Sequence, residues 1–297
     1  MASSREFLLV WDSTMSIPNG DMLNENRPRQ DEVTGQLEVS DVRIKRFVRQ
    51  EWINKGENVL VQTNVLVQTV EDNKGKILTC QGRISAIQKD NKVKDDELLE
   101  YLTKNYIDVK LFGAVITKPK KNLTGPIQVT WSKSVHEAQV KFMQGNAAYA
   151  GAEGKSQASI WSKYVTPYGL FKTYAVYNDL VAKRQNIFIE EEDISSFRDA
   201  LINGMKNYRS TSKNQMPRLL VEVIYKNNKL DGELNYIEIN KKVRDEELRS
   251  IEEIEIDLSK LAKYQDEKAN DIEKIVIYKH PSLKVINISD KFDIKTI

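Results

Sequence analysis

The residues of this chain best suited to chemistry are basic side chains clustered near the N-terminus. Guanidinium and ammonium groups form charge-assisted hydrogen bonds with phosphate oxygens. Two of these residues lie in a turn-rich loop with Asn and Gly that follows a predicted strand, and four lie on the predicted helix after that loop. A strand, a polar loop and a basic helix in this order suit contact with the backbone of a polyanion. The residues are Arg27, Arg29, Arg43, Lys45, Arg46 and Arg49.

The sequence predicts a strand over residues 5–12 and a helix that begins at Ser40 or Asp41. Ser40 is a good N-cap, and the carboxylate of Asp41 suits the positive end of the helix dipole. One face of the helical wheel is apolar and must pack on the sheet. That face contains Ile44, Phe47, Val48 and Trp52. All four basic residues of the helix are expected on the opposite face, pointing outward beside the 16–39 loop.

Two interpretations of this basic face remain open. A charged outer face can serve only to keep a helix soluble. Here all four charges have one sign and lie near Arg27 and Arg29, which favours phosphate contact. The Ser40 hydroxyl has two interpretations as well, because it can contact a ligand or only cap the helix.

Charge is distributed unevenly along the 297 residues, although the net charge is only +2. Residues 110–189 contain 11 basic and 3 acidic residues, net +8, whereas 1–109 and 190–297 each carry −3. The middle third is therefore the expected electrostatic footprint for an acidic partner. The alternatives are a chance fluctuation and a patch that faces an acidic protein. A basic loop in this third contains Lys118, Lys120 and Lys121.

Composition narrows the class of protein. A hydrophobic content of 40% and a charged content of 30% allow a buried core, in two domains or in one large domain with insertions. No apolar run approaches the ~20 residues of a membrane span, and no signal peptide is visible. Cys80 is the single cysteine, so no intrachain disulfide can form and the cytoplasm is the expected location.

The predicted elements follow the order strand, helix, strand, insertion, strand, helix, strand, which is the plan of a ferredoxin-like α+β fold. A segment rich in Gly and small residues, 137–163, is expected to form a projecting arm or loop. A hairpin turn is expected at 72–75. Further strands are expected at 58–70, 76–88, 127–135, 164–189, 216–225, 234–239 and 275–278, and helices at 95–105, 190–208, 243–250 and 258–269.

Several motifs occur in a specific order. They are Pro-Asn-Gly-Asp at 18–21, Asn-Arg-Pro-Arg at 26–29, Thr-Gly at 34–35, Ser-Asp-Val-Arg-Ile-Lys-Arg at 40–46, Asp-Val-Lys-Leu-Phe-Gly at 108–113, Gly-Pro-Ile-Gln at 125–128 and Lys-Tyr-Val-Thr-Pro-Tyr-Gly-Leu at 163–170. In this combination the chain resembles the repeated backbone subunit of type I CRISPR surveillance complexes (Cascade), and is most similar to subtype I-B. The resemblance runs from about residue 5 to about residue 225.

The resemblance implies a hand-like α+β fold. Its parts are a modified RRM or ferredoxin-like palm, inserted fingers and a protruding thumb hairpin. On this sequence the palm takes residues 1–64, 125–136 and 164–297, the fingers take 65–124, and the thumb takes 137–163. The aromatic stacking signature of the standard RNA recognition motif is missing in its usual form. We therefore expect that bases do not lie across the sheet.

The resemblance also implies a function without catalysis. Copies of the subunit stack into a helical filament along the guide RNA (crRNA), hold its phosphate backbone and present its bases to a target DNA strand in antiviral defence. Other Cascade subunits are further partners, and no cofactor or membrane is expected. The candidate RNA-binding residues are Arg27, Arg29, Ser40, Arg43, Lys45, Arg46, Arg49, Lys118, Lys120, Lys121 and Met143.

For the three lysines and for Met143, more than one interpretation of the binding role remains open. Lys118, Lys120 and Lys121 can hold phosphates of the guide or of the target strand. Met143, at the start of the thumb, is a candidate apolar wedge between bases, and local packing is its other interpretation.

Two other function classes stay open. Type III relatives cut RNA with an aspartate in the loop after the first strand, where Asp21 and Asp31 lie here, so a metal-dependent endoribonuclease is one alternative. Neither His136 nor His280 has a partner at metal-ligand spacing, and no general acid–base pair is visible. We therefore expect no enzymatic activity and no metal site. A self-assembling structural protein with an acidic protein partner is the other alternative.

Overall fold

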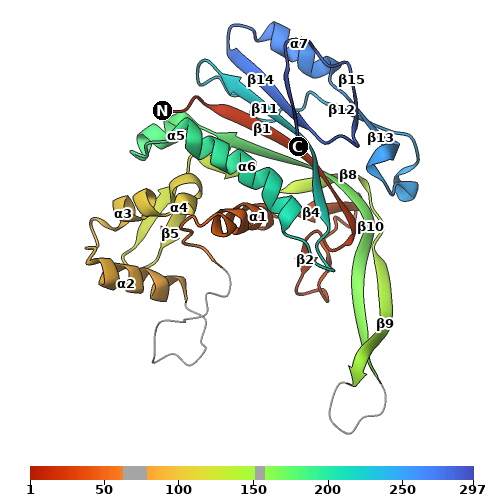
Figure 1. Cartoon of the computed structure of the whole chain (residues 1–297), viewed down its shortest axis with the longest axis horizontal. Helices are drawn as coiled ribbons and strands as arrows, with labels where there is room; N and C mark the ends of the chain where they lie inside the picture. The colour runs from red at the N-terminus through yellow and green to blue at the C-terminus, as the bar shows by residue number, and fades with distance from the viewer. Residues whose placement is uncertain (63–78, 151–157) are drawn as a thin grey trace.

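The computed structural model describes residues 1–62, 79–150 and 158–297, arranged around one large sheet (Figure 1). The strand order is β16-β14-β11-β1-β10-β8-β4, and β7 and β9 also pair with β10. The turn expected at 72–75 and the middle of the expected thumb lie outside the described residues. The strand bounds are β1 Arg5–Ser16, β4 Gln36–Val39, β7 Ile127–Val129, β8 Ser132–Glu137, β9 Lys141–Ala150, β10 Ala158–Tyr177, β11 Gln215–Tyr225, β14 Ile272–Lys279 and β16 Asp293–Thr296.

The central strand β1 is buried on both faces of the sheet. Phe7, Leu9 and Trp11 pack into one apolar core, whereas Leu8 and Val10 pack into the other. Successive side chains of a strand point to opposite faces, so this run of apolar residues requires a cover on each side. Helices form one cover and the C-terminal part of the chain forms the other (Figure 1).

Helices α1 (Asp41–Asn54) and α6 (Glu191–Asn207) pack together on the first face of the sheet. The four apolar residues predicted to face the sheet are fully buried, which confirms that part of the prediction: Ile44, Phe47, Val48 and Trp52. The two helices approach closely at Gly204, where a Cβ atom would lie 2.3 Å from the carbonyl oxygen of Phe47.

A smaller group of elements continues this side of the molecule. It consists of α2 (Cys80–Asn91), α3 (Leu98–Asn105), α4 (Ile107–Phe112) and the hairpin of β5 (Gly113–Ile116) and β6 (Lys121–Thr124). Its buried residues join the same apolar core as α1 and α6. The group is inserted in the chain between α1 and β7, whereas the predicted order had a strand between the first helix and the insertion.

The second face of the sheet is covered by the C-terminal part of the chain. This layer contains β12 (Glu238–Lys241), β13 (Ile254–Asp257), β15 (Lys284–Ile286), α7 (Ser259–Glu267) and the 3₁₀ turns Asp245–Glu247 and Ile251–Glu253. Glu6 on β1 fastens it, because its carboxylate accepts hydrogen bonds from the hydroxyls of Tyr174 and Tyr225 and from the amides of Asp231 (3.0 Å) and Gly232 (2.6 Å). Four donors compensate the cost of burying this carboxylate.

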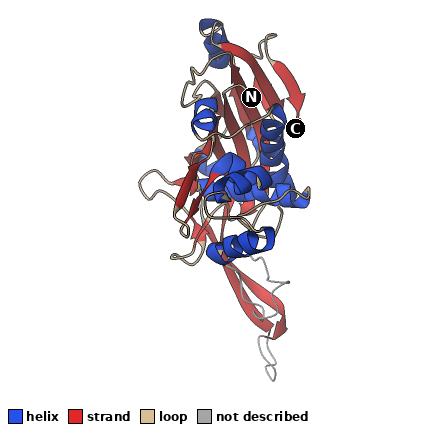
Figure 2. Ribbon diagram, turned by 90° about the vertical axis from the view of Figure 1, so that its left-hand side faces the viewer, coloured by secondary structure: helices blue, strands red, loops and turns tan. Residues whose placement is uncertain are grey.

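β9 and the first half of β10 form a two-stranded hairpin that projects from the body (Figures 1 and 2). β10 then continues into the sheet, where it pairs with β1 from Thr166 to Tyr177. One long strand therefore belongs both to the projection and to the core. The chain leaves the sheet at Tyr177 and enters the short helix α5 (Asp179–Arg184), where the sequence had predicted a strand.

Other sequence expectations are corrected in the inserted group. Residues 80–88 are helical instead of extended, and Cys80 is an exposed residue at the start of α2. Thr79 caps this helix by accepting a hydrogen bond from the amide of Gly82 at 3.0 Å. Ile84 and Ile87 are buried at the i, i+3 spacing of a helix face, which the β-branched composition obscured. Residues 59–62 are irregular, not a strand.

Elsewhere the predicted elements exist with shifted ends. The strand expected at 127–135 is interrupted between β7 and β8, and the apolar turn expected at 108–113 is α4. The helical segment expected at 243–250 contains the 3₁₀ turn Asp245–Glu247 in place of an α-helix. Among the described helices, none is both long and apolar enough to cross a bilayer.

The close approach of α1 and α6 gives a stability prediction. Gly204→Ala should lower the free energy of unfolding by about 1–3 kcal/mol, because the added methyl forces the two helices apart. The loss should occur although alanine is the better helix former. Asn203→Ala, on the same helix, is the matched control and should not destabilise. Chemical denaturation of both variants checks this, and equal stability of Gly204→Ala and wild type would contradict the described packing.

Candidate nucleic-acid interface

Ser40 caps α1, as one of its two interpretations predicted. Its hydroxyl accepts a hydrogen bond from the amide of Arg43 at 3.4 Å and donates one to Oδ1 of Asn19 at 2.9 Å. The same Asn19 oxygen accepts from the Ser40 amide at 3.0 Å. The hydroxyl therefore fixes the start of α1 against the preceding loop. Contact of Ser40 with a ligand stays a prediction.

The basic residues of α1 do not form one outward face, which corrects the sequence expectation. Arg43 is buried, with 9% of its surface exposed, and its guanidinium lies over the rings of Phe47 (4.2 Å) and Tyr208 (5.0 Å). The physical reason is angular, because Arg43 is one turn before Phe47 and so lies at the edge of the apolar face. Stacking on aromatic faces gives its guanidinium a favourable position there.

The other basic residues of α1 differ in their partners. Lys45 pairs with Asp41 at 3.0 Å, and Arg49 pairs with Asp108 at 3.0 Å. Asp108 is 1% exposed and also accepts hydrogen bonds from the amides of Leu60 and Val61, so the Arg49 pair holds the chain that follows α1. Arg46 is exposed and has no carboxylate partner among the described residues.

Arg27 and Arg29 lie in and beside the short ladder of β2 (Gly20–Asp21) and β3 (Arg27–Pro28). The Arg27 guanidinium lies 4.1 Å from the ring centre of Tyr164 and donates to its hydroxyl at 2.6 Å. Arg29 lies 3.6 Å from the carboxylate of Asp21. Both arginines line a surface pocket with Tyr164, so the structure brings this loop to the base of the β9–β10 hairpin.

Lys118, Lys120 and Lys121 form a separate group at the hairpin between β5 and β6. This hairpin is attached to the start of α2, because the side chain of Gln81 donates to the carbonyl oxygen of Lys118 at 2.6 Å. Within the described chain, no hydrogen bond or ion pair joins the three lysines to α1. They are therefore candidates for a second contact and do not extend the α1 site.

Met143 lies on β9 opposite Lys163 of β10 and is half-buried. Larger apolar side chains are more exposed on the same hairpin: Phe142 is 54% exposed, and Trp161 is 40% exposed. Trp161 packs across Gly145, where a Cβ atom would lie 2.6 Å from its ring. The hairpin therefore presents an aromatic surface that the sequence interpretation, which selected only Met143, did not include.

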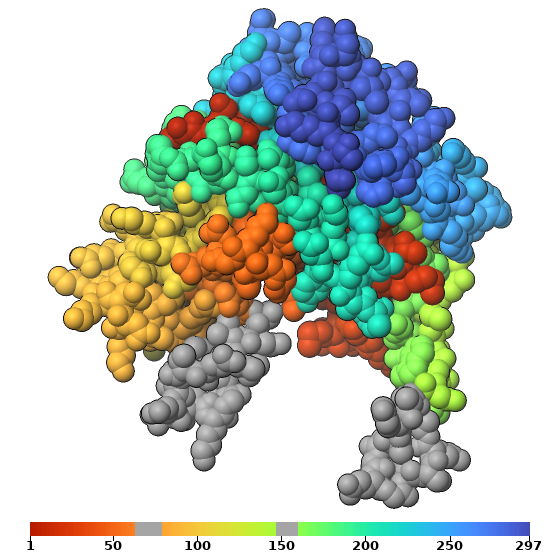
Figure 3. Space-filling view, viewed as in Figure 1, coloured from red at the N-terminus to blue at the C-terminus, as the bar shows by residue number. Residues whose placement is uncertain are grey.

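Lys213 and Tyr208 are further residues that the sequence interpretation missed. They lie after α6, and the Lys213 ammonium donates to the carbonyl oxygens of Ile17 and Pro18, which brings this segment to the loop before α1. In Figure 3 the orange surface of α1, the teal surface near residue 210 and the red surface of the 16–39 loop meet on the underside of the body. The aromatic–basic composition of residues 206–213 was the available sequence signal.

The two candidate nuclease aspartates serve as turn caps in this structure. Asp21 accepts from the Asn24 side chain at 2.7 Å, and Asp31 accepts from the amide of Val33 at 2.9 Å. These hydrogen bonds lower the pKa of each carboxyl, so both groups are ionised acceptors at neutral pH. Within the described residues, no group of three His, Cys, Asp or Glu side chains is placed to hold a metal ion.

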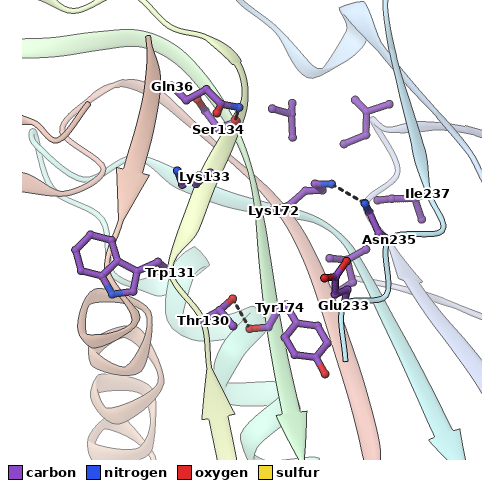
Figure 4. A pocket seen from close by; sticks show the side chains of 13 residues that line it. Gln36, Thr130, Trp131, Lys133, Ser134, Lys172, Tyr174, Glu233, Asn235 and Ile237 are labelled. Carbon is purple, nitrogen blue, oxygen red and sulfur yellow. Dashed lines mark hydrogen bonds between the residues drawn. The ribbon is translucent and has the colours of Figure 1, made fainter. Parts of the chain in front are cut away.

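Another hollow lies on the opposite face of the sheet, between β8, β10 and the C-terminal layer (Figure 4). Its lysines already have partners: Lys172 donates to Asn235 at 3.1 Å, and Lys133 lies 3.2 Å from the carboxylate of Glu38. Trp131 is half-exposed at its rim. Lys133 has a carboxylate partner, so Lys172 is the one lysine of this lining that has none within the described chain. The hollow therefore offers fewer unneutralised cations to a polyanion than the α1 side does.

Three comparisons with known proteins agree with one another. The family described as CRISPR-associated protein Cas7 matches residues 3–259. A protein of Haloferax volcanii named CRISPR-associated protein Cas7 is 24% identical to the chain and aligns with 91% of it and 85% of the relative.

Solved structures show the same architecture. A chain of a "CRISPR RNA-guided surveillance complex, pre-nicking" matches with a TM-score of 0.57 and 16% identity, covering 99% of this chain and 96% of that one. A chain of a "CRISPR RNA-guided surveillance complex" matches with a TM-score of 0.51 and 14% identity, covering 97% and 95%. At these identities the two matches show a shared fold.

The contrast between Arg49 and Arg46 gives a second prediction. Arg49→Met should lower the free energy of unfolding by about 3–5 kcal/mol, because it leaves the buried carboxylate of Asp108 without its cation. Arg46→Met, on the exposed side of the same helix, should change it by no more than about 0.5 kcal/mol. Urea denaturation checks both values. Equal losses in the two variants would show that the Arg49–Asp108 pair does not hold the fold.

Proposed function

This chain belongs to the CRISPR-associated Cas7 family, and from that premise we propose that it is a backbone subunit of a CRISPR surveillance complex that holds guide RNA by its phosphates. The observation that carries the proposal is the placement of Arg27, Arg46 and Lys213 on adjoining segments around α1. Basic groups that track a backbone bind a strand without reading its sequence.

The strand order supports an RRM-like palm. Along the chain the elements run β1, α1, β7 with β8, β10, α6 and β11, and across the sheet they lie in the order β11, β1, β10, β8. This is a βαββαβ unit with both helices on one face. The proposed palm comprises 1–64, 125–136 and 164–297, with fingers at 65–124 and a thumb at 137–163.

In this proposal the C-terminal layer explains why the RNA lies beside α1. Standard RRM domains stack bases on the open face of their sheet. Here that face carries Tyr168 and Tyr225 into a buried core with the C-terminal layer. The bound strand therefore follows the loop before α1, the exposed side of α1 and the base of the hairpin.

The projecting hairpin would contact a neighbouring copy along the guide. Its exposed aromatic residues and Met143 are suited to lie against a displaced base, while the remaining bases stay free to pair with a target DNA strand. The proposal also includes self-stacking of this kind and binding to the other Cascade subunits. It further assigns the chain to subtype I-B and to the cytoplasm. The chain would have no catalytic role, since Asp21 and Asp31 cap turns.

The first test is to purify the chain from its own cells, extract the bound nucleic acid and sequence it. We expect uniform short RNAs with repeat-derived ends, because backbone contacts along a guide protect a defined length. Random cellular RNA or no nucleic acid would contradict the guide-holding role. Absence of nucleic acid would favour the structural alternative, in which residues 110–189, with a net charge of +8, bind an acidic protein.

The salt dependence of RNA affinity tests the proposed surface. Arg46→Gln and Arg27→Gln should each weaken binding and flatten the slope of log affinity against log salt by about 0.7, the value for one lost phosphate contact on a single strand. Lys263→Gln, on α7 across the sheet, is the matched control and should leave the slope unchanged. Unchanged slopes in both arginine variants would remove this surface from the proposal.

A further inference from the structure

We propose that Arg43, Arg46, Tyr208 and Lys213 form a built site for one phosphodiester group of the bound RNA, and that filling the site protonates Lys213. This inference rests on the proposed function and deepens it. It assigns a binding role to Lys213 and to Tyr208, and it gives the buried Arg43 a ligand.

The first observation concerns the unpaired hydrogen-bond donors of the Arg43 guanidinium. Its Nε and Nη2 atoms are buried and have no hydrogen-bond partner among the described residues. Buried polar atoms without a hydrogen-bond partner are uncommon, and each one needs a physical explanation. The side chain is held by stacking on Phe47 and Tyr208, so its position is fixed while two of its donors remain unused.

The second observation is that two more cations lie beside Arg43. The Arg46 guanidinium lies 5.7 Å from the ring centre of Tyr208, on whose ring Arg43 also lies. The Lys213 ammonium is held by the carbonyl oxygens of Ile17 and Pro18. Lys45 and Arg49 on the same helix have carboxylate partners, whereas these three cations have none within the described chain.

Burial and the two neighbouring arginines lower the pKa of Lys213. Burial, followed by repulsion from Arg43 and Arg46, lowers the pKa of Lys213 from 10.5 to about 7. The groups that face this ammonium are the two arginines of α1 and the backbone carbonyls of the loop before it. Burial also lowers the pKa of Arg43 to about 10, so its guanidinium remains charged at neutral pH.

A phosphodiester fits this cluster better than a neutral ligand does. It carries one negative charge and several acceptor oxygens, which can take the free Arg43 donors and the charge of Arg46 together. The Tyr208 ring supports both guanidinium groups at the same time. The cluster also adjoins Ile17 and Pro18, which lead into the loop of Arg27, so a strand that contacts this loop passes the site.

The direction of the pH effect follows from the two states of Lys213. Below the free-state pKa of about 7, Lys213 is charged in both states and binding takes up no proton. Above it, the arriving anion raises the pKa of Lys213, so binding takes up one proton and affinity falls by up to about tenfold per pH unit. Once pH exceeds the pKa of the bound state, the affinity becomes constant again.

The experiment combines lysine NMR with RNA affinity on the full chain. The probe is single-stranded guide RNA, and the ¹³Cε signal of Lys213 is assigned by its loss in Lys213→Gln. We expect RNA to raise the pKa of Lys213, and we expect Lys213→Gln to abolish the fall of affinity between pH 7 and 9. Lys213→Arg should keep tight binding and also lose the pH dependence. Lys263→Gln should retain the wild-type profile.

Three results would overturn the inference. One is a Lys213 pKa that does not move when RNA binds, and a second is a pH dependence that survives in Lys213→Gln. The third is an equal response to inorganic phosphate or to an acidic peptide in place of RNA, which would reveal a general anion site. Failure of wild type to bind guide RNA at any pH would instead remove the proposed function, so the two failures are distinguishable.

Discussion

Burial of the central sheet on both faces is the constraint on which the rest of the structure depends. β1 alternates apolar side chains between two cores, so neither face can be left open to water. The helices cover one face, and the C-terminal layer covers the other. Glu6 ties that layer to the sheet through buried hydrogen bonds that would be costly to break. A ligand therefore has access to the edges of the sheet, to the surface over its helices and to the hollow between β8, β10 and the C-terminal layer.

This constraint divides the basic residues into two physical groups. Arg49 has a buried carboxylate partner, so the charge of Arg49 stabilises the fold. Removal of Arg49 would leave the buried carboxylate of Asp108 without a cation. Arg43, Arg46 and Lys213 have no such partner in the described chain, and their repulsion is a cost that the free protein bears. Charge count alone cannot separate these groups. What separates them is whether a carboxylate lies within reach.

The sequence was sufficient to predict the elements whose pattern is local. The apolar face of α1, its Ser40 cap and the helix at 191–207 all follow from spacing and capping rules. Arg43 was misplaced because a residue at the edge of an apolar face can turn either way, and stacking on Phe47 and Tyr208 decided the outcome. The composition of residues 206–213 could have drawn attention to Lys213, but its contact with the loop at Ile17 could not be predicted, since that contact exists only after α6 and β11 have packed. Residues 80–88 were missed because β-branched residues also fit a short buried helix.

Proteins place unfavourable local arrangements where function requires them. A cluster of like charges with unused buried donors lowers the stability of the free chain, and an arriving phosphate converts that cost into binding energy. The same reasoning explains why two donor atoms of Arg43 are left unpaired, while those of the buried Arg5 are used by Glu191, by Glu222 and by the carbonyl oxygen of Ser3. An arginine whose task is structural meets its carboxylates within the chain. An arginine that binds an external ligand keeps its donors unpaired in the free protein. Aromatic stacking holds its guanidinium in position without neutralising the charge.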